Sequence, residues 1–388
     1  MAISEKFADQ NFRNLIAAIA AVSVFCFSLG EMYPLLSLRL EAQGISPDLI
    51  GLNSAMSPIG IIVAGLFVSR LAHHFGPKPV ALWAAGLTGV VLLAYPLLPS
   101  LAAWFVLRFL QGGLVAILFA LSESWVVAFA RGRYQARVTA IYSSVIAAGF
   151  GAGAGVLGFT GIDGYLPFII GALVMWLAMP VIALVKAPAS NPEDSHVGVV
   201  AFLPKAPLLL LAVLVHALLD GASIAFFPVY ALAFNYSAEM AAFMVTALAF
   251  GNVFLQLPIG WLADHFPKRL VITWCFIVTG VGLVMLEWLI ETIWIWPLLM
   301  IVGASSFGIY SVGLASLGER FKGPDLVAGT AAFSAMWGAG ALLGSVVVGY
   351  AIQAQGPAGL PNSLIACVAI YLVLQFFRFL QMRRASAS

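Results

Sequence analysis

Long apolar stretches, separated by short polar connections, recur along the whole chain. A membrane-spanning helix needs about 20 mainly apolar residues, because each residue adds about 1.5 Å across a hydrocarbon core about 30 Å thick. Twelve stretches of suitable length are present, at residues 13–39, 49–71, 78–98, 101–129, 136–160, 165–186, 206–233, 239–262, 270–290, 294–318, 327–354 and 361–381. The pattern predicts an all-α polytopic membrane protein with twelve transmembrane helices.

The two halves of this pattern repeat at an offset of 191 residues. The loop Leu71–Lys78 matches the loop Leu262–Arg269, and single glycines such as Gly60 and Gly251 match as well. Chance matches between Gly- and Ala-rich helices could explain the glycines, but not a loop that repeats His, Phe and basic residues. We therefore expect a duplication, with two pseudo-symmetric six-helix bundles in the same orientation, related by an axis along the membrane normal.

One polar connection is longer than the others and divides the chain. It covers residues 187–205 and is expected to be a cytoplasmic linker between an N-terminal bundle at 1–186 and a C-terminal bundle at 206–388. If both ends are cytoplasmic, every Lys and Arg except Arg39 and Arg108 lies on the cytoplasmic side. Cytoplasmic loops carry such an excess of basic residues. The short loops are typical of a bacterial inner-membrane protein, which is the location we expect.

Composition supports the membrane assignment. Hydrophobic residues make up 62% of the chain and charged residues 9%, whereas a soluble domain carries about 25% charged residues. The net charge of +2, spread over short loops, does not indicate a nucleic-acid partner. The cysteines Cys26, Cys275 and Cys367 lie inside apolar runs and are expected to pack there. No metal site or cofactor is expected.

Two motifs resemble the major facilitator superfamily. Its loop signature, roughly Gly-x-Leu-Ala-Asp-Arg-x-Gly-Arg-Lys, is similar to Gly260–Arg269, while the first half has Ser69, His73 and His74 at the Gly, Asp and Arg positions. Its helix-4 pattern Arg-x-x-Gln-Gly is present at Arg108–Gly112. The stretch Ser122–Trp125, before Arg131-Gly132-Arg133, further resembles the YcaD-like branch. The resemblance implies secondary transport by alternating access, with helices 1, 4, 7 and 10 lining a central cavity.

Charged residues inside spanning helices are costly, about 2.5–3.5 kcal/mol each on insertion scales, so each one needs a reason. Glu31 in helix 1 and Arg108 in helix 4 are both expected about 10–12 Å below the outer surface. If helices 1 and 4 both face the cavity, the matched depths favour an ion pair between them. It either fixes the bundle or opens when a proton or the substrate binds.

Helix 7 carries His216 and Asp220, which share one face because they are four residues apart. A partly desolvated carboxyl group near the membrane midplane holds a proton more readily than one in water, which suits a proton carrier. The alternative is a helix–helix hydrogen bond. Asn252 and Gln256 form a similar pair in helix 8, and they either contact the substrate or bond a neighbouring helix.

A second set of residues lies near the cytoplasmic loops and is expected to form gates. Glu123 could pair with Arg70, Lys78 or a helix end, as a gate or a stabilising contact. In the second half, Asp264 is expected to accept from a helix N-terminus, together with Lys268 and Arg269. Because His73 replaces this aspartate in the first half, and His74 follows it, that lock is either missing or dependent on pH.

These features favour a secondary active transporter of a small organic solute, coupled to protons, with the direction open and export among the options. The chain lacks a nucleotide-binding Gly-x-x-x-x-Gly-Lys-Ser/Thr loop. Five dispersed histidines offer no metal cluster, and no nucleophile–base set is apparent, so an enzyme is not expected. A lipid-moving protein and a non-transporting receptor or scaffold remain alternatives. We expect a monomer in a lipid bilayer.

Overall fold

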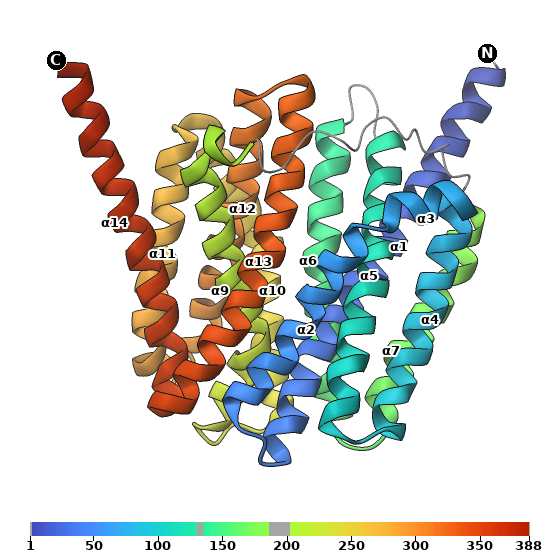
Figure 1. Cartoon of the computed structure of the whole chain (residues 1–388), viewed down its shortest axis with the longest axis horizontal. Helices are drawn as coiled ribbons and strands as arrows, with labels where there is room; N and C mark the ends of the chain where they lie inside the picture. Colours follow the sequence, from blue (N-terminus) through green and yellow to red (C-terminus); the bar gives the residue numbers. More distant parts are fainter. Residues whose placement is uncertain (1, 130–134, 186–201, 388) are drawn as a thin grey trace. The chain divides into compact units, whose positions relative to one another are not determined.

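The computed structural model describes residues 2–129, 135–185 and 202–387, and these form helices without strands. The helices are α1 (Ala2–Ala42), α2 (Pro47–Gly65), α3 (Val68–Phe75), α4 (Pro77–Leu97), α5 (Leu101–Phe129), α6 (Gln135–Thr160), α7 (Leu166–Leu184), η2 (Leu203–Lys205), α9 (Pro207–Leu232), α10 (Ala238–His265), α11 (Lys268–Leu289), α12 (Ile295–Arg320), α13 (Gly323–Gln355), η3 (Gly356–Ala358) and α14 (Gly359–Ala387) (Figure 1).

Twelve of these described helices are long, which confirms the predicted number. Ten described stretches are long and apolar enough to cross a membrane. One of them, Ala328–Arg378, covers most of both α13 and α14, and the remaining long helix, α6, has a shorter apolar part at Ser144–Thr160. The chain is therefore a multi-pass membrane protein.

The chain forms two compact units, each with its own set of packed helices. The first contains α1, α3, α4, α5, α6 and α7, the part of α2 from Asn53, and the start of α10 at Ala238–Thr246. The second contains α9, α11, α12, α13 and α14, the start of α2 and the rest of α10. The predicted boundary at residues 187–205 lies mostly outside the described residues, as do Arg131 and Arg133, and the bundle division stays a prediction.

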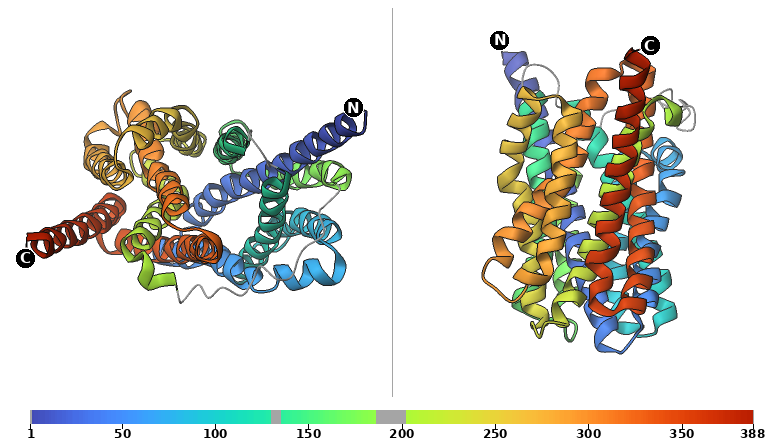
Figure 2. Two further views of the ribbon diagram at one scale, coloured as in Figure 1. Left: turned by 90° about the horizontal axis from the view of Figure 1, so that it is seen from above. Right: turned by 90° about the vertical axis from the view of Figure 1, so that its left-hand side faces the viewer.

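The same helix pairings occur in both units. In the first unit α1 packs on α5, α6 and α7, and α4 packs on α5 and α7. In the second unit α9 packs on α12, α13 and α14, and α11 packs on α12 and α14 (Figures 1 and 2). Each helix of the first set thus has a counterpart in the second, as a duplication requires.

Close helix crossings repeat at the offset seen in the sequence. A side chain on Gly153 of α6 would overlap the backbone oxygen of Phe27 in α1. The counterpart Gly344 of α13 meets the backbone oxygen of Leu218 in α9 in the same way. Small residues allow helix backbones to approach closely. The glycines therefore mark the same α1–α6 and α9–α13 crossings in the two units.

A second crossing repeats as well. A side chain on Gly60 of α2 would overlap the backbone oxygen of Phe109 in α5, and one on Gly251 of α10 would overlap that of Met300 in α12. Each partner lies 191 residues from its counterpart. The predicted pseudo-symmetry of the fold is confirmed at the level of individual contacts.

Two predicted helices, 13–39 and 49–71, differ most from the structure. α1 extends from Ala2 to Ala42, beyond the predicted 13–39. The predicted helix 49–71 is broken, because α2 ends at Gly65 and the amides of Leu66 and Phe67 bond carbonyls only three residues back, at 3.2 and 2.9 Å. Leu66 and Phe67 are apolar but exposed, so hydropathy gave no sign of the break.

Candidate functional site

The first unit buries a cation on α5. Arg108 is 2% exposed, and its Nη1 donates to Oδ1 of Asn53 on α2 at 3.4 Å. The guanidinium lies 4.6 Å from the ring centroid of Tyr33 on α1, a cation–π contact. Its Nη2 has no hydrogen-bond partner among the described residues. Arg108 is therefore held by neutral groups and keeps part of its donor capacity unused.

Gln111, the other polar residue of the Arg-x-x-Gln-Gly motif, is also buried and hydrogen-bonded. Gln111 Oε1 accepts from the hydroxyl of Tyr95 on α4 at 2.9 Å, and Nε2 donates to Ser28 Oγ on α1 at 3.4 Å. Gly112 follows, and a side chain there would overlap the backbone of Ser57 on α2. The motif thus connects α5 to α1, α2 and α4 inside the first unit.

Glu31 lies at the same depth as Arg108 but does not pair with it. The contacts of Ser28 with Gln111 and of Tyr33 with Arg108 bracket Glu31 along α1. Its side chain is fully buried, and Oε2 lies against Gly171 of α7. Within the described part of the chain, both carboxyl oxygens lack a hydrogen-bond partner. The expected ion pair is absent from this structure, because the carboxyl group points toward α7 while Arg108 contacts α2.

In the second unit, His216 packs against α12. His216 is fully buried, and its Nδ1 lies 3.2 Å from Ser306 Oγ. Its Nε2 has no hydrogen-bond partner in the part of the chain that the structure describes. Its ring lies 5.8 Å from that of Tyr310 and 6.0 Å from that of Phe307. The hydrogen bond of His216 is thus between helices and does not involve Asp220.

Three further predicted residues belong to the second unit. Asp220 is partly exposed and makes no hydrogen bond or ion pair within the described chain. Gln256 on α10 donates through Nε2 to Ser311 Oγ on α12, while its Oε1 is buried without a partner. Asn252 is 7% exposed, and its Oδ1 also lacks a partner. Gln256 thus makes the interhelical bond that was one of the two alternatives for this pair.

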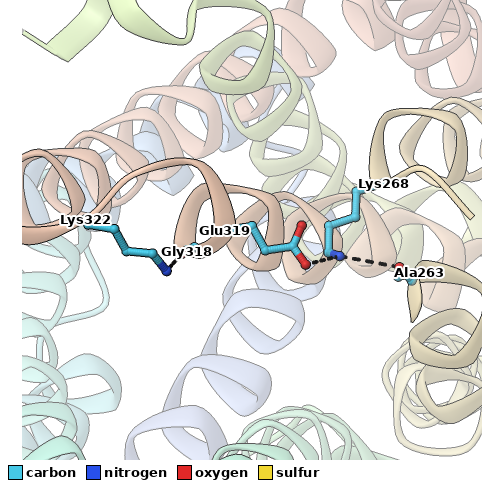
Figure 3. A network of polar contacts seen from close by, with 5 residues as sticks. All are labelled: Ala263, Lys268, Gly318, Glu319 and Lys322. Carbon is cyan, nitrogen blue, oxygen red and sulfur yellow. Dashed lines mark hydrogen bonds and ion pairs between the residues drawn. The ribbon is translucent and has the colours of Figure 1, made fainter. Parts of the chain in front are cut away.

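The gate residues of the second half are arranged differently from the expectation. Lys268 Nζ forms an ion pair with Oε1 of Glu319 at 2.5 Å and donates to the carbonyl of Ala263 at 3.5 Å (Figure 3). Asp264 is exposed and has no partner among the described residues. Arg269 Nη2 donates to the carbonyl of Gln375 on α14 at 3.5 Å. The ion pair therefore uses Glu319 instead of Asp264.

The gate residues of the first half are exposed or half-buried. Arg70, His73 and His74 are exposed on the short helix α3, and Lys78 lies half-buried in the first turn of α4. Glu123 is exposed near the end of α5, and no ion pair to Arg70 or Lys78 forms in the described chain. The expected lock in this half is thus not closed in this structure.

Sequence reasoning missed several residues of these clusters, namely Tyr33, Asn53, Ser54, Ser57, Tyr95, Ser306, Ser311 and Glu319. Asn53 carried a usable signal, since an amide inside an apolar run is as unusual as the charges that were singled out. Serines gave no signal, because they are common in membrane helices as packing residues.

Comparison with known proteins agrees with this architecture. The sequence pattern of the Major Facilitator Superfamily matches residues 16–207 and 209–387. The chain is 25% identical over 364 residues to the MFS-type transporter YfkF of Bacillus subtilis (strain 168), covering 86% of this chain and 88% of YfkF. It is 23% identical over 341 residues to the MFS-type transporter YcaD of Escherichia coli (strain SE11), covering 86% and 87%.

A solved structure shows the same fold. A point mutant of the nucleoside transporter NupG superposes with a TM-score of 0.77 at 14% identity, covering 95% of this chain and 99% of that one. The family match extends over nearly the whole chain, and the YcaD-like relatives cover most of it. The chain therefore belongs to the Major Facilitator Superfamily and is similar to its YcaD-like transporters.

Proposed function

We propose that the chain is a proton-coupled secondary active transporter that moves a small organic solute across the membrane by alternating access. The observation that carries the proposal is the buried carboxyl of Glu31, at the depth of the buried Arg108. Among the described residues, Glu31 is unpaired and Arg108 has no acidic partner. No hydrogen bond or ion pair joins the two groups in the described chain, so they do not hold the helices together as a pair. Ionisable residues inside membrane helices are costly, and they mark proton and substrate pathways.

The two residues suggest how a proton changes the state of the unit. A neutral Glu31 fits the apolar space beside Gly171 and Leu92, because a carboxylate there would have no partner. A charged Glu31 is stabilised by turning toward Arg108, which lies at the same depth on α5. Proton uptake and release would therefore switch Glu31 between two contacts, as a coupled transport cycle requires.

Asp220 provides a second carboxyl group that could bind and release the coupled proton. It is partly exposed on α9 and free of partners in the described chain, one turn from His216. It would exchange protons with water more readily than the sealed Glu31. The two acids make separate predictions, since replacing either one by its amide removes only that proton site.

The proposal includes the setting of the protein. We propose a monomer in the bacterial cytoplasmic membrane. The distribution of Lys and Arg supports an orientation with both termini in the cytoplasm. The direction of solute movement, export included, is left to the flux measurement. A lipid-moving protein or a non-transporting receptor would be the outcome if water-soluble solutes are not moved.

The test is solute flux in proteoliposomes that contain the purified protein. Radiolabelled metabolites are screened first by counterflow, which needs no proton gradient, and then by accumulation driven by a pH gradient. We expect Glu31→Gln to keep counterflow and to lose gradient-driven accumulation, because the fixed neutral side chain cannot carry a proton. Asp220→Asn is measured in the same way.

Glu291→Gln is the matched control, because this glutamate is exposed between α11 and α12. It should leave both fluxes unchanged. If Glu31→Gln and Asp220→Asn both accumulate solute like the original protein, proton coupling through these acids is wrong. If no solute shows counterflow while the protein is folded, the transporter proposal itself fails.

A further inference from the structure

We infer that the transported solute carries a carboxylate, and that Arg108, Asn53, Ser54 and Ser57 bind this group. The inference rests on the proposed transport function and adds the chemical class of the solute. It is carried by the buried polar atoms of these four residues that have no partner.

The unpartnered atoms around Arg108 are mainly donors. Arg108 Nη2 and Asn53 Nδ2 carry N–H groups, and the hydroxyls of Ser54 and Ser57 can each donate. All four side chains are at most 2% exposed. Buried polar groups in proteins are nearly always hydrogen-bonded, so unpartnered donors on α2 and on the adjoining α5 can be explained by a ligand that binds them.

The helix geometry brings these donors to one side of α2. Asn53 reaches Arg108, and Ser57, one turn further along α2, packs its backbone against Gly112, one turn along α5. Asn53 and Ser57 therefore share the face of α2 that meets α5. Ser54 precedes Ser57 by three residues and lies beside that face. Gly112 is needed here, because any side chain would separate the two helices.

The charge of this cluster is unbalanced. The guanidinium of Arg108 contacts an amide oxygen and an aromatic ring, but no carboxylate of the residues that the structure describes. Glu31, the acid at this depth on α1, has its carboxyl against Gly171 instead. A buried cation without a counter-charge is unfavourable. An anionic ligand would supply the missing charge and accept the unused hydrogen bonds.

A carboxylate suits these donors better than a neutral group. Its two oxygens can accept from a guanidinium in parallel, and they offer further acceptor positions for an amide N–H and hydroxyls. Glu31 could offer the same group from within the chain. The solute and Glu31 would then be alternative partners of Arg108, which would link solute binding to the position of Glu31.

The buried polar groups of the second unit are not a set of donors around a cation. The unpartnered atoms of its described residues are Asp48 Oδ1, His216 Nε2, Tyr230 Oη, Asn252 Oδ1, Gln256 Oε1 and Gln375 Oε1, and four of these six are carboxyl or amide oxygens that can only accept. No Lys or Arg hydrogen-bonds them in the described chain. An anion is therefore expected at the first unit, and Asn252 provides a matched amide position without a cation.

The first experiment compares acids with their own amides. The melting temperature of the purified full chain is measured with acetate, lactate and benzoate, and with acetamide, lactamide and benzamide, at millimolar concentrations. A ligand that binds only the folded state raises this temperature. We expect at least one acid to raise it more than its amide does, and Arg108→Gln to abolish the difference. Equal effects of acids and amides, or no effect of any acid, would overturn the inference.

A second experiment supplies the anion from within the chain. Asn53→Asp places a carboxylate beside Arg108 and should raise the melting temperature while removing the stabilisation by acids. Asn252→Asp, without a neighbouring cation, should lower the melting temperature. If both variants lower it to the same extent, Arg108 has no need of an anion and the inference is wrong.

Flux measurements separate the inference from the proposed function. If acids stabilise the protein through Arg108 but are not moved in proteoliposomes, the binding site stands and transport of these acids fails. If a neutral solute is moved equally well by the original protein and by Arg108→Gln, transport stands and the anion site is wrong.

Discussion

The carboxyl group of Glu31 occupies the space that Gly171 leaves open by having no side chain. A Cβ on Gly171 would overlap Glu31 Oε2 and would lie 3.1 Å from Leu92 Cδ1. The three residues come from α1, α7 and α4, so the carboxyl is sealed between helices of the first unit. Both of its oxygens are without hydrogen-bond partners there.

Gly171→Ala should therefore destabilise the protein by displacing Glu31. Overpacking a filled interior typically costs about 1–3 kcal/mol. We expect a lower melting temperature of the purified protein, and a partial recovery in the double variant Gly171→Ala with Glu31→Ala, because the second change removes the overlapping atoms. Melting curves of the two single variants and the double variant give the interaction energy between positions 31 and 171.

Gly86 offers a control on the neighbouring helix α4. A Cβ there would lie 3.5 Å from Met179 Cε, an ordinary contact, so Gly86→Ala should not lower the melting temperature. If the losses from Gly171→Ala and Glu31→Ala simply add, the side chain of Glu31 does not fill the space at Gly171.

The depth of Glu31 could be predicted from the sequence, but its direction could not. Counting residues along a helix gives depth, because the rise per residue is fixed. The direction of a side chain depends on which neighbour leaves room for it. That neighbour is Gly171, which lies 140 residues further along the chain and looks like any other glycine of an apolar helix.

The repeat was the most informative feature of the sequence, and the helix crossings explain why its glycines match. Gly153 and Gly344 matched at a fixed offset because each lies at a helix crossing where a side chain would overlap a backbone oxygen. Glu319, in contrast, was missed. It lies beyond the predicted apolar run 294–318, and its partner Lys268 is far from it in sequence, so no local pattern joined them.

The paired crossings predict equal sensitivity in the two units. Gly153→Ala and Gly344→Ala should lower the melting temperature by similar amounts, because each methyl group would meet a backbone oxygen that can move only with its helix. Gly318→Ala is the control within α12, since nothing lies within 4 Å of a Cβ there. It should raise stability slightly, as alanine favours a helix by about 1 kcal/mol over glycine. If only one of the two glycine variants lowers the melting temperature, the two crossings are not equivalent.

The ion pair of Lys268 and Glu319 should contribute little to stability. The side chain of Glu319 is 63% exposed and that of Lys268 16%, and exposed pairs typically contribute less than about 1 kcal/mol. We expect a small loss of melting temperature in Glu319→Gln, smaller still at high salt. The reversed pair, Lys268→Glu with Glu319→Lys, should recover it.

Asp264→Asn provides the comparison for this pair. The aspartate is exposed and without a partner in the described chain, so its replacement should leave the melting temperature unchanged. A larger loss for Asp264→Asn than for Glu319→Gln would mean that the loop signature keeps the aspartate contact expected from the family resemblance.

The packing role of His216 can be distinguished from its polar role by comparison with the corresponding residue of the first unit. At the 191-residue offset, His216 corresponds to Phe25 and Tyr310 to Phe119. The rings of Phe25 and Phe119 lie 4.7 Å apart, and those of His216 and Tyr310 5.8 Å apart. The fold therefore accepts an apolar ring at this position.

We predict that His216→Phe keeps the melting temperature, whereas His216→Ala lowers it, since emptying a buried aromatic site costs about 3 kcal/mol. The phenyl ring fills the site and removes the unpartnered Nε2, although Ser306 loses its bond. If solute flux falls in His216→Phe while stability is kept, the imidazole serves transport. Unchanged flux in the stable His216→Phe variant would make the residue a packing element, as Phe25 is in the first unit.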